Sequence, residues 1–228
     1  MNTPLVNGPA SPSLHTFFTA KFPQVKLTME THVAAQRVVA SRRRKGEPVQ
    51  EAWESAKAGF PRSAAWLTKQ QAKHLKTDFK HSVFYLAEGY VGRPSLVSGG
   101  AAKFFSDAGI PNAGWRLTRD EQGHFDRGPR QGKKDDLEKS GAKLIHEHVW
   151  TGEMAWEACL QLYVEGNLSV DSLVELFHTN FCTAWVLRSE NKALNKSKRG
   201  KDITSALAHY RSRGVSLYRE NDPNVVNP

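Results

Sequence analysis

Apolar side chains recur at helical spacing through most of the first ninety residues. Between residues 28 and 44 they repeat at steps of three and four, and the run ends in a basic cluster before Gly46. Residues 48–58 and 68–87 show the same spacing, with Pro48 suited to a first helical turn and Thr68 to an N-cap. These patterns predict a mainly helical N-terminal part.

The pattern changes in the second half of the chain. Two-residue alternation around a polar turn predicts a hairpin near 115–125, and β-branched or aromatic runs predict strands at 143–149 and 181–187. Helical spacing returns in several stretches, at 95–108, 151–164, 169–177, 190–195 and 203–213. The predicted fold class is α+β, predominantly helical with a small antiparallel sheet.

Changes in composition suggest where the chain divides. Residues 1–13 and 221–228 are rich in Pro, Asn and Ser, so we expect a disordered first tail and a loose second one. Residues 127–140 are almost free of apolar side chains and predict an exposed loop. We therefore expect a helical N-terminal part over 14–140, which includes the hairpin, and a second part over 141–220.

Charge favours a polyanionic partner. The 228 residues include 32 Lys and Arg against 23 Asp and Glu, a formal net charge of +9, and such an excess attracts nucleic acid. Cys159 and Cys182 show no metal-binding spacing. No signal-like segment or membrane-length apolar run occurs in the sequence, which predicts a cytoplasmic protein with no membrane partner.

The strongest candidate chemistry lies in the strand predicted at 143–149. Its side chains alternate, so His146 and His148 share one face and Glu147 the other. A His-x-His pair on a strand suits a divalent metal ion. At a frayed strand end the alternation relaxes, and Glu147 and His148 could then both reach one phosphate-sized pocket. A polar end to an ordinary strand is the simpler interpretation of the same residues.

The order Glu147-His148, then Asn180 before the second strand, then Asn191 in the following helix resembles the HNH, or ββα-metal, nucleases over residues 143–196. The resemblance implies a ββα-metal-like element in the part spanning 141–220, with a helical insertion between its two strands. The pairing of those strands across the insertion is the point on which the resemblance depends.

The resemblance also implies a role for each site residue. His148 would be the general base that deprotonates a water molecule. Glu147 and Asn191 would bind one divalent ion, most simply Mg²⁺, with Asn195 as the alternative amide ligand. Asn180 would orient the loop around His148, and His146 would support a neighbouring side chain.

Basic side chains gather in two further places. One group follows the candidate site and could grip flanking phosphates: Lys192, Lys196, Lys198 and Arg199. The other, which we call the lysine stripe, follows one face of the helix predicted at 68–87: Lys69, Lys73, Lys76 and Lys80. A solvated face is the ordinary explanation of such a stripe, and contact with DNA is the alternative.

The leading hypothesis from the sequence is a metal-dependent endonuclease that hydrolyses DNA phosphodiester bonds, with RNA left open as a substrate. A homodimer would suit cutting of both strands. The main alternative is a non-catalytic nucleic-acid-binding or regulatory protein that uses the lysine stripe and the basic loop 196–201. A hydrolase of small phosphate esters is the third hypothesis.

Overall fold

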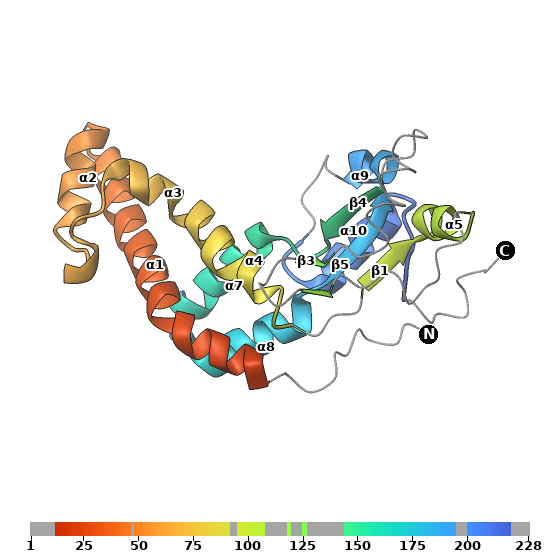
Figure 1. Cartoon of the computed structure of the whole chain (residues 1–228). Helices are drawn as coiled ribbons and strands as arrows, with labels where there is room; N and C mark the ends of the chain where they lie inside the picture. The colour runs from red at the N-terminus through yellow and green to blue at the C-terminus, as the bar shows by residue number, and fades with distance from the viewer. Residues whose placement is uncertain are drawn as a thin grey trace. The chain divides into compact units, whose positions relative to one another are not determined.

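The computed structural model describes residues 12–46, 48–91, 95–107, 118–119, 125–126, 144–194 and 200–219 (Figure 1). The chain forms two compact units, each built from separate stretches of sequence. We call one the helical unit, whose described residues lie within Ala10–Tyr90 and Ala155–Leu176, and the other the sheet unit, whose described residues lie within Val91–Met154 and Phe177–Pro228. The predicted tail at 221–228 and the predicted loop at 127–140 lie outside the described residues, as do residues 1–11.

The helical unit is organised along one long helix, α1 (Pro12–Arg44), drawn in red to orange in Figure 1. It is longer than the helix predicted at 28–44 and continues through Pro23. α1 packs against α2 (Val49–Lys57) and α3 (Lys69–Phe79), and a short 3-10 turn, η1 (Arg62–Ala64), lies between these two in sequence. The N-terminal part is helical, as predicted.

The helix predicted at 68–87 is present but contains a change of winding. Thr68 caps α3 through a reciprocal pair with Gln71, whose side-chain oxygen accepts from the Thr68 amide at 2.7 Å. The chain then widens into a π-helical turn, η2 (Lys80–Phe84), before α4 (Tyr85–Ala87). Leu75, Phe79 and Val83 are buried, as the apolar period predicts, whereas Leu86, one turn further on, is exposed.

Two later helices, α7 (Gly152–Val164) and α8 (Val170–Asn180), place most of their length in the helical unit and one end each in the sheet unit. Ser169 begins α8 by accepting the Ser172 amide at 3.0 Å, while the Ser172 hydroxyl oxygen accepts the Ser169 amide at 2.8 Å. The core of the helical unit is rich in aromatic and long aliphatic side chains: Phe18, Met29, Phe79, Phe84, Trp156 and Leu173.

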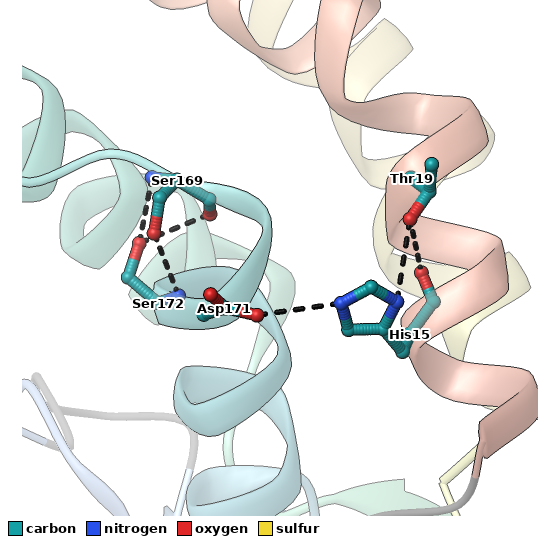
Figure 2. Close-up of polar contacts among 5 residues, drawn as sticks. All are labelled: His15, Thr19, Ser169, Asp171 and Ser172. Atoms are coloured by element: carbon teal, nitrogen blue, oxygen red, sulfur yellow. Dashed lines mark hydrogen bonds and ion pairs between the residues drawn. The ribbon is translucent and has the colours of Figure 1, made fainter.

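Figure 2 shows polar contacts on α1 and at the start of α8, one of which, between His15 and Asp171, joins the two helices. His15 Nε2 lies 3.3 Å from Asp171 Oδ1, and His15 Nδ1 lies 3.4 Å from the Thr19 hydroxyl oxygen. The order Thr, His, Asp is that of a hydrolase triad, but the Thr19 hydroxyl donates its proton to the His15 carbonyl oxygen at 2.9 Å. The ion pair is also largely exposed. These contacts therefore form a surface tie of small energetic value and not a nucleophilic centre.

The sheet unit contains a four-stranded sheet in the order β4-β5-β1-β6. β5 (Thr183–Leu187) pairs antiparallel with β4 (Leu144–His148) and parallel with β1 (Ser95–Ser98), and β6 (Leu217–Arg219) pairs antiparallel with β1. The sheet is therefore small, as predicted, but mixed rather than antiparallel. Separately, β2 (Thr118–Arg119) and β3 (Phe125–Asp126) pair antiparallel where the hairpin was predicted.

The parallel pairing arises from a strand that the sequence did not reveal. Residues 95–108 were predicted as one helix, but Ser95–Ser98 form β1 and only Gly99–Asp107 form a helix, α5. β1 lies between β5 and β6, and its successive residues Leu96 and Val97, which point to opposite faces, are both buried. A four-residue strand without polar alternation gives no two-residue period to detect. The helices α9 (Arg188–Leu194) and α10 (Ile203–Ser212) complete the unit.

The start of α5 is locked to the start of α9. The buried Ser98 hydroxyl accepts the Ala101 amide at 3.1 Å and donates to Glu190 Oε2 at 2.5 Å, and the same carboxylate oxygen accepts the Leu187 amide at 2.8 Å. Glu190 thus caps α9 and ties it to α5 through one charge-assisted network.

None of the described helices combines the length and the apolarity that a membrane crossing requires.

Two neighbouring glycines in the first turn of α5 provide a matched test of this lock. A Cβ at Gly100 would lie 2.8 Å from both Glu190 Oε1 and Leu187 Cδ1, whereas a Cβ at Gly99 would meet only Tyr218 Cε2, at 3.7 Å. Glu190 cannot withdraw without giving up its bonds to Ser98 and Leu187. We expect Gly100→Ala to lower the free energy of unfolding by about 1–2 kcal/mol, and Gly99→Ala to be neutral or slightly stabilising. Urea titration of both variants checks this, and equal midpoints would contradict the lock.

Burial of His32 in the helical unit should make stability depend on pH. Its ring packs edge-to-face on Trp156 at 4.9 Å, and burial, helped by the charge of Lys76, lowers the pKa of His32 below its ordinary value of 6.5. The folded state then binds fewer protons than the unfolded state below pH 6.5, so this contribution to stability is complete above pH 6.5 and declines as the pH falls below it.

We therefore expect His32→Gln to flatten the pH dependence of the unfolding free energy between pH 7.5 and pH 5, as measured by urea titration. His74→Gln, which removes an exposed imidazole from α3, serves as the control. A His32→Gln profile that retained the wild-type slope would contradict the assignment.

Candidate functional site

The two strands of the candidate site pair with each other in a regular antiparallel register. Glu147 lies opposite Ala184 and His148 opposite Thr183, and the ladder continues when the Val149 amide donates to the Cys182 carbonyl oxygen at 2.9 Å. The helical insertion between the strands therefore does not prevent their pairing. α9 follows β5 directly and contacts both β5 and β4. Strand, strand and helix thus come together in the sheet unit.

The regular ladder has a consequence for the two principal site residues. Side chains alternate along a paired strand, so Glu147 and His148 project from opposite faces of the sheet. The frayed strand end considered from the sequence is not what the described residues form. β4 is the edge strand of the four-stranded sheet, so the two faces meet around its outer edge. A phosphate group that contacted both side chains would have to span this edge, and Glu147 Oε2 is itself buried.

His148 is held by an aromatic cluster that joins the end of β4 to the end of α8. Its ring packs edge-to-face on Phe181, with centroids 5.7 Å apart, and Phe181 stacks on Phe177 at 6.3 Å. Trp150 packs edge-to-face with Phe177 at 5.2 Å. Phe177, Phe181 and Trp150 are all buried, whereas His148 is only half-buried. The cluster fixes the orientation of the imidazole and leaves part of it accessible.

Asn180 is buried, and its side-chain amide bonds to the backbone at the start of α10. Its Oδ1 accepts the amide of Ile203, the first residue of α10, at 3.1 Å. Asp202 caps the same helix by accepting the Ser205 amide at 2.7 Å, and this bond lowers the pKa of the Asp202 carboxyl. Asn180 therefore binds a backbone group of α10.

The remaining predicted ligands are only partly described. Asn191 is half-buried on α9, in a helix that contacts β4. Asn195 lies outside the described residues, and so does the side chain of His146, whose backbone pairs with Trp185. Within the described stretches of chain, no three His, Cys, Asp or Glu side chains gather closely enough to share a metal ion.

The predicted nucleic-acid-binding residues fall into separate units. The lysine stripe lies on α3 and η2 of the helical unit, where Lys73 is exposed and Lys69, Lys76 and Lys80 are half-buried. Lys192 is exposed on α9 of the sheet unit. Lys196, Lys198 and Arg199 lie outside the described residues.

Two residues that the sequence analysis did not assign to the site are joined to it. The Trp150 indole Nε1 donates to the carbonyl oxygen of Lys201 at 3.4 Å, which brings the start of α10 to the end of β4. A tryptophan two residues after the candidate base offers no signal in a single sequence that would separate this contact from ordinary core packing. Lys201 was recognised in the sequence only as the last residue of the basic loop 196–201.

Comparison of the chain with models of protein families, with curated proteins and with solved structures found no match. A functional proposal therefore rests on the sequence and on the geometry described above.

Proposed function

We propose that the chain is an endonuclease that hydrolyses phosphodiester bonds of DNA at a site centred on His148. The observation that carries the proposal is the antiparallel pairing of β4 with β5, with α9 following directly. Two antiparallel strands followed by a helix are also the order of elements in a ββα-metal site, and this agreement supports the proposal. His148 stands at the end of the first strand, where such a site places its general base.

In this proposal His148 accepts a proton from the water molecule that attacks phosphorus. Its half-buried ring is oriented by the edge contact with Phe181, so one edge of the imidazole can face the solvent while the other packs on the protein. A positioned imidazole contributes roughly 10²–10⁴-fold to such a proton transfer. The net positive charge of the chain favours accumulation of DNA near the site.

Two of the predicted ligands carry oxygen donors of the kind that a hard divalent ion prefers. Glu147 on β4 and Asn191 on α9 offer carboxylate and amide oxygens from two elements in contact, and Mg²⁺ is commonly held by one or two such ligands together with water and phosphate. The ion, when bound, would stabilise the negative charge that develops on the phosphate and the leaving oxygen. Because Glu147 and His148 lie on opposite faces of β4, we place the substrate phosphate at the outer edge of this strand.

The proposal is tested by cleavage of supercoiled plasmid DNA in the presence of Mg²⁺ or Mn²⁺. We expect His148→Ala to lower the cleavage rate by at least about 100-fold, because the variant lacks the general base. His74→Ala removes an exposed imidazole from the helical unit and should cleave like the wild type. Chelation of the divalent ion should abolish cleavage by all three proteins.

Each other result selects a different function. Cleavage by His148→Ala at the wild-type rate would contradict the site. Binding of DNA with a steep salt dependence but without any cleavage would favour a non-catalytic binding protein. Hydrolysis of a chromogenic phosphate monoester without cleavage of DNA would favour a small-ester phosphatase. Parallel assays with single-stranded RNA define the range of substrates, and sedimentation of the protein on duplex DNA tests the homodimer that two-strand cutting would favour.

A further inference from the structure

The segment Gly200–Ile203 connects the basic loop to α10 and is held in place by several elements of the sheet unit. Trp150 Nε1 donates to the Lys201 carbonyl oxygen, and Asn180 Oδ1 accepts the Ile203 amide. Asp202, between them, caps α10 through Ser205. Trp150, just after β4, thus fixes Lys201, and Asn180, at the end of α8, fixes Ile203. Asp202, between them, is tied to the first turn of α10 by its own side chain.

Gly200 makes the segment still more constrained. Its φ angle is +93°, in the region that favours glycine, and a Cβ at this position would lie 2.2 Å from the Ser205 Cβ. The chain therefore passes directly over the first turn of α10 and can do so only with glycine. This close approach fixes the position of the backbone of the following residue, Lys201.

One of the side chains that hold this segment, Trp150, also belongs to the cluster that orients His148. Trp150 contacts Phe177, and Phe177 stacks on Phe181, against which the His148 ring lies. Asn180 lies between these two phenylalanines in sequence, at the end of α8. The backbone of Lys201 is therefore bonded to the residue that stands two positions after His148. The Lys201 side chain is exposed.

We propose that Lys201 binds a backbone phosphate of DNA beside the phosphate attacked at His148, and that Trp150 and Asn180 are the positioning residues that place it there. This inference rests on the proposed function. A lysine acts as a point charge toward a phosphate. A backbone that is fixed in advance lowers the ordering cost of forming the contact, which separates Lys201 from a lysine on an unconstrained surface.

The experiment measures binding of the full-length His148→Ala protein to fluorescein-labelled duplex DNA over a series of KCl concentrations. Addition of Lys201→Ala should reduce the magnitude of the slope of log K against log salt by about 0.9, the value for one phosphate contact, and should weaken binding about fivefold near physiological salt. Lys201→Arg should restore the slope. Lys26→Ala, which removes one exposed positive charge from α1, is the matched control and should leave the slope unchanged.

A second measurement distinguishes binding from a general structural effect. In the otherwise wild-type protein, Lys201→Ala should raise KM for DNA while kcat stays within about twofold, since uniform binding is lost and the general base is intact. A slope for Lys201→Ala equal to that of its parent, with DNA still bound, would overturn the role of Lys201 and leave the nuclease proposal standing. Absence of both DNA binding and DNA cleavage by the parent proteins would overturn both proposals.

Discussion

The pairing of β4 with β5 is the interaction on which the rest of the candidate site depends. It fixes His148 opposite Thr183 and carries the ladder on to Val149 and Cys182. Without this pairing the two strands would be separate segments joined by a helical insertion. α9, which follows β5 directly, would then not be brought into contact with β4. Because backbone hydrogen bonds set the register, they also determine to which face of the sheet each side chain of β4 points.

The end of α8 links this ladder to α10. Within its last turn and the next residue, Phe177 and Phe181 hold the rings of Trp150 and His148, and Asn180 holds the first amide of α10. One short stretch of chain therefore positions the candidate base and the segment that carries Lys201. Deletion of the Asn180 acceptor would leave a buried amide without its bond to this side chain, which is costlier than the loss of an exposed hydrogen bond.

Much of the fold could be predicted from periodicity. Apolar steps of three and four identified the buried face of α3, and the aromatic and β-branched run at 181–187 identified β5. β1 was missed because a strand covered on both faces has no alternation, and its four residues resemble the start of the helix that follows. The grouping of α7 with the N-terminal helices was also hidden, since it follows from contacts between residues far apart in the chain.

The candidate site shows the same division between local and distant information. The adjacency of Glu147 and His148 was visible in the sequence, but their opposite faces follow from a ladder that remains regular to the end of β4. The partner of Asn180 could not be inferred, because a buried amide can accept from any backbone group that folding brings near it. Gly200 carried a weak signal, as a glycine just before an Asp202 N-cap, but its contact with Ser205 required coordinates.

The most direct test of this account is nuclear magnetic resonance of the isotope-labelled protein, with the backbone assigned around both strands. Paired strands predict cross-strand nuclear Overhauser effects between Glu147 and Ala184 and between His148 and Thr183, together with slow hydrogen exchange of the Val149 amide, which donates to Cys182. Absence of these effects, with fast exchange of the Val149 amide in a folded protein, would contradict the pairing and the site built on it.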